Sequence, residues 1–419
     1  MADKQIDKYL PKLRFPEFKD EGEWQVVRLG DVVRCFSGGT PSATNKDYYG
    51  GDIPFIRSGE LHSSKTELYL TRAGLENSSA KMVEKGTILY ALYGATSGDV
   101  GIARVSGAIN QAILAIIPNA NIDKMYLYQY LSYSKDFIIN RFLQGGQGNL
   151  SASIITSLSI PLPTIQEQKI ISSCLSSLDE CIALSKKKLE QLKAHKSGLM
   201  QKLFPAPGKS LPEYRFPEFQ YADNWQTQTL GELGDCYSGL SGKSKDDFGH
   251  GKAEYITYLN VFNNSIVNSA FNQPIEEDPK QHQVRFGDIF FTISSETPDE
   301  VGMSSVWIEN RKNVYLNSFC FGYRVRQLSN LFDIVYLSYF FRSDTFRKKI
   351  TVLAQGIARY NISKNRVMEL SIQYPSIQEQ KIIAGCLHSL DEIIRSYSIN
   401  ISSLREQQKG LLQRMIPRL

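Results

Sequence analysis

The sequence lacks any apolar run long enough to cross a membrane as a helix. The best stretch, residues 334–341, is far short of the roughly 18 residues that a spanning helix needs. The first ten residues are polar and do not contain the apolar segment of a secretion signal. We therefore expect a cytoplasmic protein without a membrane span.

Cysteine is scarce, and its spacing fits neither a metal site nor a redox motif. None of the six cysteines belongs to a CxxC pair or lies near histidines at ligand spacing. Four of them occupy two pairs of repeated positions, Cys35 with Cys236 and Cys174 with Cys386. We interpret these four as small buried side chains of a repeated frame, and we expect no bound metal.

An excess of charge of one sign is also missing. The chain has 48 Lys and Arg against 43 Asp and Glu, which gives a net charge of +5. Segments 19–162 and 220–374 are close to neutral, and the basic surplus lies mainly in 164–203. A uniformly basic face for nucleic acid is therefore not visible, and any contact with phosphates has to come from local clusters.

Motifs for catalysis are absent as well. GLSGKS at 239–244 resembles part of a phosphate-binding loop, but Tyr237 stands where that motif requires its first glycine. We find no N/D-P-P-Y/F stretch for adenine methylation, no glycine-rich cofactor loop, and no E-x-K partner for PDE at 298–300. The sequence therefore predicts a chain that is not an enzyme and carries no cofactor of its own.

What the sequence does contain is two phrases that each occur twice. IQEQKII at 165–171 returns at 377–383, and LPKLRFPEF at 10–18 returns as LPEYRFPEF at 211–219. The displacements are 212 (377 − 165) and 201 (211 − 10), so the second copy carries 11 extra residues, inserted between the counterparts of 102 and 148. The chain is predicted to be two tandem units whose repeated segments are alike and whose intervening segments differ.

Each unit has the pattern of a mixed α/β domain followed by a long helix. Short apolar runs between glycines and prolines predict buried strands. Aromatic and aliphatic residues at three- and four-residue spacing predict one helix over 123–144 and another over 331–355. The predicted strands are 86–94, 112–118, 287–293 and 318–325.

The repeated phrase has the signature of a helix start in both copies. Thr164 with Glu167, and Ser376 with Glu379, have the spacing of a capping box. In a capping box the hydroxyl and the carboxylate each accept a hydrogen bond from the other residue's backbone N–H. A helix is therefore predicted to begin at each of these two positions.

A coiled-coil seam follows each predicted start. Apolar residues step by four and three along about 40 residues, which corresponds to roughly 60 Å of helix. The one polar position that both seams share is Lys196 in the first helix and Gln408 in the second. Pro205 and Pro417 end the two helices. The two long helices are expected to pack on each other.

This pattern resembles the specificity subunit of a type I restriction–modification system, and the resemblance covers nearly the whole chain. Segment 37–61 resembles the opening of many recognition domains of that family. P-x-I-Q-E-Q-K-I-I at 163–171 and 375–383 resembles the family's repeated region. The second domain departs from the pattern, because 238–261 lacks the GGTP element of the first.

The resemblance implies an α+β fold class, with two tandem mixed α/β target-recognition domains separated by two long helices that form an antiparallel coiled coil. The expected first domain is 1–162 and the first long helix 163–204. A linker and the second domain are expected over 205–374, and the second long helix over 375–419.

It also implies a function. Each domain would read one half of a split, asymmetric double-stranded DNA site, and the helices would hold two methyltransferase subunits that methylate adenine. Restriction–translocase subunits would complete the complex, with S-adenosylmethionine, ATP and Mg on the partner subunits. Two alternatives stay open: a nuclease or methyltransferase with unrecognised motifs, and a coiled-coil scaffold that binds proteins without DNA specificity.

Polar loops are the best candidates for DNA contact, because Arg pairs with guanine and Asn or Gln with adenine in the major groove. The competing interpretation is a polar turn in which glycine serves the backbone, and a loop-capping role for the recurring asparagines. The run RKK at 347–349 is a candidate for phosphates, although such a run is more often a solvated face. The candidate DNA-binding residues are Lys46, Tyr48, Tyr49, Gln144, Gln147, Asn149, Lys243, Lys245, Arg359, Tyr360, Asn361 and Lys364.

Overall fold

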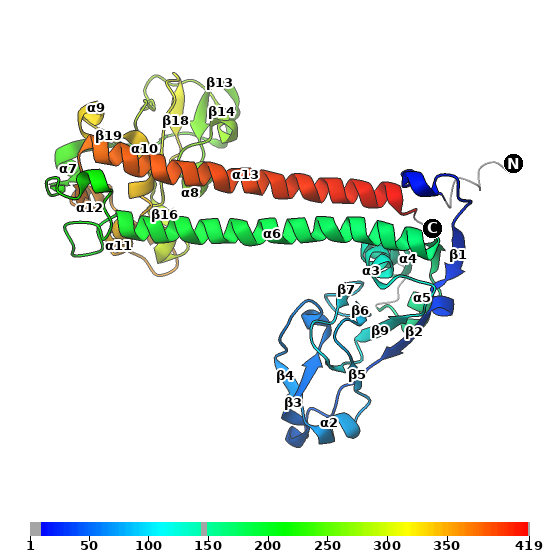
Figure 1. Ribbon diagram of the computed structural model, residues 1–419. Helices are drawn as coiled ribbons and strands as arrows, with labels where there is room; N and C mark the ends of the chain where they lie inside the picture. The colour runs from blue at the N-terminus through cyan, green and yellow to red at the C-terminus, as the bar shows by residue number, and fades with distance from the viewer. Residues whose placement is uncertain (1–9, 144–148, 418–419) are drawn as a thin grey trace. The chain divides into compact units, whose positions relative to one another are not determined.

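The computed structural model describes residues 10–143 and 149–417 (Figure 1). The chain divides into unit 1, residues 1–186 with 399–419, and unit 2, residues 187–398. The long helices α6 (Ile165–Leu203) and α13 (Ile377–Met415) each contribute one part to either unit. Within the described ranges no helix combines the length and apolarity of a membrane span.

The domain of unit 1 is built on two four-stranded sheets. The first sheet is antiparallel, in the order β2 (Val33–Ser37), β9 (Ile113–Pro118), β6 (Ile88–Ala91), β7 (Val100–Ile102). The second has the order β4 (Leu68–Leu70), β3 (Tyr49–Ile56), β8 (Gly107–Ile109), β5 (Lys81–Val83), with β3 and β8 parallel. β1 (Gln25–Arg28) pairs with β10 (Ser159–Leu162). The strands predicted at 86–94 and 112–118 are thus confirmed as β6 and β9.

The domain of unit 2 repeats this frame. Its antiparallel sheet has the order β12 (Gly234–Ser238), β19 (Cys320–Val325), β15 (Ile289–Thr292), β17 (Ser304–Val306). β13 (Phe248–Ile256) lies between β14 (Gln273–Ile275) and β18 (Val314–Leu316). Two further pairs are β11 (Gln226–Thr229) with β21 (Ser371–Tyr374), and β16 (Ser294–Ser295) with β20 (Tyr360–Asn361). The strands predicted at 287–293 and 318–325 are confirmed as β15 and β19.

The helix that follows each antiparallel sheet is divided in two, so the prediction of one continuous helix in each unit is wrong. α3 (Lys124–Tyr133) and α4 (Lys135–Phe142) meet at Ser134, and α10 (Ile334–Phe340) is separate from α11 (Asp344–Thr351). In unit 2 the hydroxyl of Ser343 accepts a hydrogen bond from the Phe346 N–H and starts a new helix. The remaining α-helices are α1 (Leu29–Val32), α2 (Arg72–Glu76), α5 (Ala152–Thr156), α7 (Leu230–Leu233), α8 (Tyr258–Asn263), α9 (Leu328–Leu331) and α12 (Lys364–Met368).

The 11 extra residues of the second copy are spread over three places. The displacement between equivalent strands rises from 201 at β6 and β15 (289 − 88) to 207 at β9 and β19 (320 − 113). It becomes 210 at the helix caps Asp123 and Asp333 (333 − 123), because unit 2 inserts α9 there. It reaches 212 at Asn149 and Asn361. The insertions lengthen connections and leave the sheets intact.

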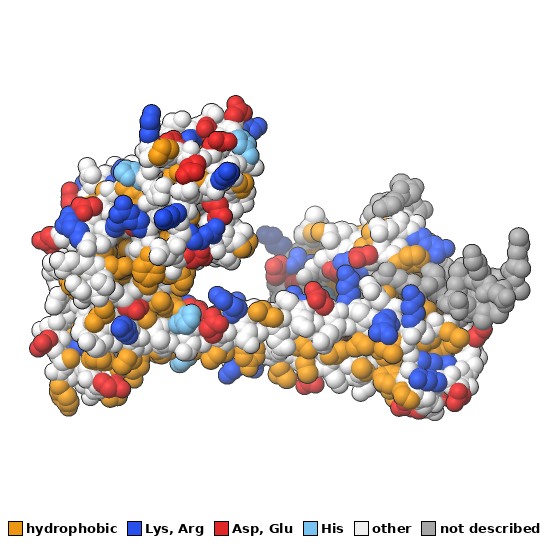
Figure 2. Space-filling model, turned by 90° about the horizontal axis from the view of Figure 1, so that it is seen from above, with side chains coloured by type: hydrophobic (Ala, Val, Ile, Leu, Met, Phe, Trp, Pro, Cys, Tyr) orange, Lys and Arg blue, Asp and Glu red, His pale blue; other side chains and the backbone are white. Residues whose placement is uncertain are grey.

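Charges of both signs are interspersed on the face of the molecule that Figure 2 shows. On the face shown in Figure 2, Lys and Arg side chains alternate with Asp and Glu, without a continuous basic area on that face. This distribution agrees with the near-neutral composition of 19–162 and 220–374.

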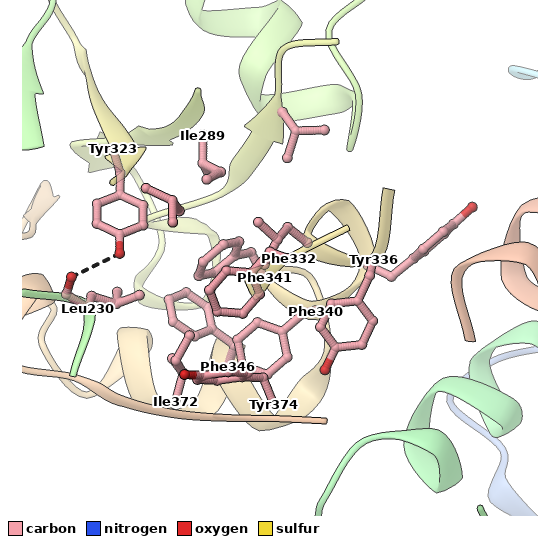
Figure 3. Close-up of a cluster of buried hydrophobic side chains, with 14 of the residues drawn as sticks. Leu230, Ile289, Tyr323, Phe332, Tyr336, Phe340, Phe341, Phe346, Ile372 and Tyr374 are labelled. Atoms are coloured by element: carbon pink, nitrogen blue, oxygen red, sulfur yellow. Dashed lines mark hydrogen bonds between the residues drawn. The ribbon is translucent and has the colours of Figure 1, made fainter. Parts of the chain in front are cut away.

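The core of unit 2 is rich in aromatic side chains (Figure 3). Phe291 stacks on Phe321 with ring centroids 5.3 Å apart, and the ring of Phe341 meets Phe291 edge-on, also at 5.3 Å. The buried hydroxyl of Tyr323 donates to the Leu230 carbonyl at 2.9 Å. Each such ring contributes about 1.5–3 kcal/mol through burial.

The last turns of the two long helices belong to these cores. Leu203 and Phe204, at the end of α6, are buried in the core of unit 2. Met415 and Ile416, at the end of α13, are buried in the core of unit 1. Each long helix therefore ends in a similar segment, Leu-Phe-Pro or Met-Ile-Pro. Its two apolar residues are buried in a domain core, and its proline interrupts the helical hydrogen bonds.

The long helices pack antiparallel in each unit, as predicted. All the positions of the expected seam are buried or half-buried. In unit 2, Lys196 donates to both carboxylate oxygens of Asp391, at 2.6 and 2.7 Å. In unit 1, Gln408 donates to Asp179 at 2.7 Å. The polar seam positions are thus paired, and the same spacing of 17 residues separates Asp179 from Lys196 (196 − 179) and Asp391 from Gln408 (408 − 391).

Candidate nucleic-acid interface

The two repeated phrases bind each other in each unit, and this contact fixes the frame on which the loops stand. In unit 1, Arg14 of RFPEF donates two hydrogen bonds to the carboxylate of Glu167, both 2.8 Å long. It also donates to the carbonyls of Glu21 and Gly22, at 2.6 and 3.1 Å. The bond to Glu167 raises the pKa of Arg14, because the carboxylate favours the charged guanidinium.

Unit 2 contains the same arrangement. Arg215 donates to the carboxylate of Glu379 at 2.9 and 2.7 Å, and to the carbonyls of Ala222 and Asp223 at 3.0 and 3.2 Å. Both carboxylates are almost fully buried. We call each arginine–glutamate pair a clasp, because it joins the segment before the domain to the helix after it.

The clasps change the expected helix start. The backbone N–H groups of Glu167 and Glu379 donate to Thr164 and Ser376, each at 3.4 Å, so half of the predicted capping box forms. The carboxylates, however, accept from the arginines instead of closing the box. A bidentate bond to an arginine is stronger than a single bond to a backbone N–H, which explains the difference.

The glutamine that follows each clasp glutamate holds the start of the domain helix. Gln168 accepts from the Asp123 N–H at 2.7 Å and donates to the Asn121 carbonyl at 3.2 Å. Gln380 accepts from the Asp333 N–H at 3.0 Å and donates to the Leu331 carbonyl at 2.9 Å. The phrase IQEQ therefore orients each domain against its long helix through two adjacent buried side chains.

In unit 1, the candidate residues lie on two connections. Lys46 is exposed at the start of a short 3₁₀-helix, Lys46–Tyr48, in which Tyr48 is half-buried. The hydroxyl of Tyr49 donates to the Pro41 carbonyl at 2.7 Å, which gives this side chain a structural role in the loop. Asn149 is exposed. Gln144 and Gln147 lie outside the described residues.

In unit 2, the loop at 355–361 is closed by the backbone. Asn361 and Gln355 exchange two backbone hydrogen bonds, at 2.8 and 2.9 Å, and Tyr360 pairs with Ser295 through β20. The amide of Asn361 donates to the Arg359 carbonyl at 3.4 Å, in keeping with a loop-capping role. Arg359 is exposed on this loop.

The candidate lysines of unit 2 differ in how far they are engaged. Lys243 pairs with Asp278 at 2.9 Å, and this bond raises the pKa of the lysine. Lys364 donates to the hydroxyl of Ser238 at 2.7 Å, which brings the end of β12 next to the start of α12. Lys245 is exposed at the start of a 3₁₀-helix. Lys245 is thus the most available of the three for a phosphate.

The run at 347–349 is mainly structural, so its interpretation as a solvated face is wrong. Arg347 donates to the carbonyls of Asp299, Val301 and Gly302 at 2.6–2.7 Å. Lys349 donates to the Ser371 carbonyl at 2.7 Å. Burial lowers the pKa of both side chains. Lys348 alone of the run is exposed.

Sequence reasoning missed a basic hollow of about 430 Å³ in unit 2. Segments 279–285 and 310–312 line it together with Arg324. Arg324 is occupied by Asp288, at 2.7 Å, and Arg311 by Glu254, at 2.6 Å. The other His, Lys and Arg side chains that line it are His282, Arg285 and Lys312, and all three are exposed. The stretches KQHQVR and NRK could have indicated it, but they are 25 residues or more apart in the sequence.

The cysteines are free thiols. The four at repeated positions are half-buried and not buried as expected, and burial raises the pKa of Cys35 to about 11. Among the residues that the structure describes, no three His, Cys, Asp or Glu side chains are arranged to hold a metal ion.

Two domains with different loops, each held by the same clasp on a shared pair of helices, define a modular recognition protein. The chain belongs to the family of type I restriction modification DNA specificity domains, whose family model matches residues 21–194 and 222–404. It is accordingly a non-catalytic specificity subunit that recognises DNA and assembles with methyltransferase subunits.

Relatives and solved structures agree with this assignment. The chain is 23% identical to the type I restriction enzyme MjaVIII specificity subunit of Methanocaldococcus jannaschii, over 96% of this chain and 93% of that protein. It is 28% identical to the EcoR124I/EcoR124II specificity subunit of Escherichia coli, over 43% of this chain and 46% of that protein. The crystal structure of a type I system S subunit from M. genitalium shares the fold, with a TM-score of 0.58, 18% identity, and coverage of 98% of this chain and 100% of that one.

Proposed function

We propose that each domain reads one half of a split, asymmetric DNA site. The observation that supports this proposal is that the clasps are alike in the two units while the exposed loops differ. The clasps Arg14–Glu167 and Arg215–Glu379 have the same partners and nearly the same distances, whereas the exposed loops differ in sequence and length. One frame that presents two different sets of side chains suits a site with two different halves.

The proposed domains keep the boundaries expected from the sequence, 1–162 and 205–374, with long helices over 163–204 and 375–419. We propose that the helices dock two methyltransferase subunits that methylate adenine in each half, and that restriction–translocase subunits join them. S-adenosylmethionine, ATP and Mg would then bind those partners. The DNA that the complex reads would place it in the cytoplasm. A solved structure described as showing complex assembly of a type I system shares this fold, with a TM-score of 0.58.

For the DNA contacts, we propose two roles. The exposed side chains Lys46, Asn149 and Arg359 stand on variable loops and would contact base edges or the adjacent backbone. The basic hollow would bind phosphates through Arg285 and Lys312. Its other two arginines, Arg311 and Arg324, already pair with carboxylates of the protein. This division supplies a phosphate footprint without a continuous basic surface.

Methylation-aware sequencing tests the proposed function. The chain is expressed with the methyltransferase subunits of its own system in a host without other adenine methylation. We expect methylated adenine in a single motif with two specified halves and an unspecified spacer. Omission of this chain, as the control, should abolish the methylation. Methylation without this chain, or at a motif with no spacer, would contradict the proposal.

A further inference from the structure

A second hollow in unit 2, of about 350 Å³, lies beside Arg359. It is formed where four segments meet: α8, β16 with the turn after it, the loop before β19, and the loop at 355–361. The side chains that matter for its chemistry are Leu259, Phe262, Phe319, Glu296, Glu300 and Arg359.

The walls of this hollow are held in place by hydrogen bonds and stacking. The Tyr258 hydroxyl donates to the Ser294 carbonyl at 2.7 Å, and its ring stacks on Phe262 with centroids 5.8 Å apart. The backbone N–H of Phe319 donates to the side chain of Asn317 at 2.8 Å, and its carbonyl accepts from Ile293 at 2.9 Å. The hollow is thus a built feature of the fold.

Two large apolar side chains are nevertheless left open to solvent there. Leu259 is 65% exposed and Phe319 is 58% exposed. Apolar side chains gathered at a concave place and rimmed by polar groups mark a contact site, because their exposure to water is unfavourable. Whatever covers them has to offer an apolar surface.

The charges beside these side chains narrow the choice of occupant. Glu296 and Glu300 outnumber Arg359, so the hollow disfavours a phosphate. Glu296 and Glu300 are both exposed, and Glu300 already accepts from the hydroxyls of Ser295 and Thr297, at 3.3 and 2.8 Å. In the major groove, an A·T pair presents the methyl group of thymine at one end and, beyond the O4 acceptor, the amino group of adenine. The methyl group matches the apolar wall, and the amino group can donate to a carboxylate.

Unit 1 has different chemistry at the corresponding place. Ile56 and Ile256 pair with the equivalent residues Ile109 and Leu316, so the displacement here is 200 and Ser58 stands where unit 2 has Tyr258 (258 − 58). The aromatic wall is therefore a feature of one domain. Two domains that read dissimilar half-sites are expected to differ in this way, because their side chains have to contact different bases.

We propose that the hollow beside Arg359 binds the C5-methyl group of a thymine in the half-site read by unit 2, with Leu259 and Phe319 as its contacts. The inference rests on the proposed function, since it needs a DNA site. Arg359, on the rim, is then placed to donate to a neighbouring acceptor on a base edge.

The test is a replacement of thymine by deoxyuridine, which removes only the methyl group. Duplexes that contain the methylated motif carry this replacement at one thymine of the half-site at a time. Binding by the assembled complex of this chain with its methyltransferase subunits is measured in competition with the unmodified duplex. We expect one position at which the replacement weakens binding about fourfold, since burying one carbon is worth about 0.8 kcal/mol.

The variants Phe319→Ala and Leu259→Ala should bind the unmodified duplex more weakly and lose the discrimination at that position alone. Phe271→Ala is the matched control, because Phe271 is 57% exposed but does not line the hollow. It should retain the full fourfold effect. Both test residues are exposed, so these variants are expected to fold.

Four results would overturn the inference. Equal binding of every deoxyuridine duplex would show that no methyl group is held, and a half-site without thymine would do the same. A fluorescence increase from 2-aminopurine placed in the same strand next to the sensitive thymine would indicate an unstacked base as the occupant in place of a methyl group. If the complex binds no duplex specifically, the proposed function fails first, and the inference fails with it.

Discussion

Arg14 and Arg215 occupy the same position in two different units, and each neutralises a buried carboxylate at the start of a long helix. The guanidinium groups also satisfy backbone carbonyls at the turn before the first strand of each domain. Each clasp therefore connects three parts of its unit through one side chain. At this scale the repeated phrases are explained as two halves of one contact.

Removing a clasp carboxylate should destabilise its unit strongly. Glu379→Ala leaves the guanidinium of Arg215 buried without its partner, and breaking a buried pair in this way costs about 3–5 kcal/mol. Chemical denaturation of the assembled complex measures the loss. Glu190→Ala is the control, since Glu190 forms an exposed pair with Lys193 that is worth about 0–1 kcal/mol. Equal, small effects of the two substitutions would contradict the role of the clasp.

Arg359→Ala tests base recognition by one side chain. If the guanidinium contacts a guanine, specific binding should weaken by about 1–3 kcal/mol and one base position should become relaxed. Competition binding with duplexes substituted at each half-site position measures both effects. Lys348→Ala, an exposed cation of the same domain, serves as the control. Uniform weakening on all sequences would assign Arg359 to a phosphate, and no effect would leave it as part of a turn.

At the scale of elements, patterns that depend on neighbouring residues were predicted correctly. The strands β6, β9, β15 and β19, and the long helices, follow from apolar runs and from the seven-residue seam. The break between α10 and α11 was not predicted, because apolar spacing continues across Ser343. The clasp was not predicted because its partners Arg14 and Glu167 lie 153 residues apart and each phrase also fits a local interpretation.

The candidate site was less predictable than the frame. Lys46 and Arg359 are exposed, in agreement with their selection as candidates for DNA contact. Lys243 and Arg347, in contrast, are bonded to other groups of the protein. A sequence shows which residues are basic and does not show which carboxylates or carbonyls meet them. The hollow beside Arg359 depends on four segments that only the fold brings together.

The long helices offer a prediction about the spacer between half-sites. Seven extra residues in both helices, near Leu189 and near Ile401, keep the seam in register. The pairs Asp179–Gln408 and Lys196–Asp391 lie on opposite sides of both insertions, so both are retained. The helices should lengthen by about 10 Å, which corresponds to about three base pairs at ~3.4 Å each.

Methylation of a library that varies only the spacer length measures the result. Surviving activity should move to a longer spacer while both half-site sequences stay fixed. Some loss of activity is expected, because three base pairs rotate a half-site by about a quarter turn or more. Insertion in one helix alone should disrupt one polar pair and abolish activity. Full activity on the original spacer alone would show that the helices do not set the spacing.

At the scale of the whole molecule, we propose that two domains on equivalent frames read two halves of one site independently. The clasp residues Arg14 and Glu167 lie outside the segment 19–160, so an exchange of that segment leaves the frame in place. Only the sheets, their connections and the loops of the first domain are replaced. The second domain keeps all its residues.

The most direct test is therefore to exchange residues 19–160 for the first domain of another family member and to sequence the methylated adenines. We expect that one half of the methylated motif changes to the half that the donor domain reads, while the other half stays the same. A change in both halves, or an unchanged motif, would contradict it.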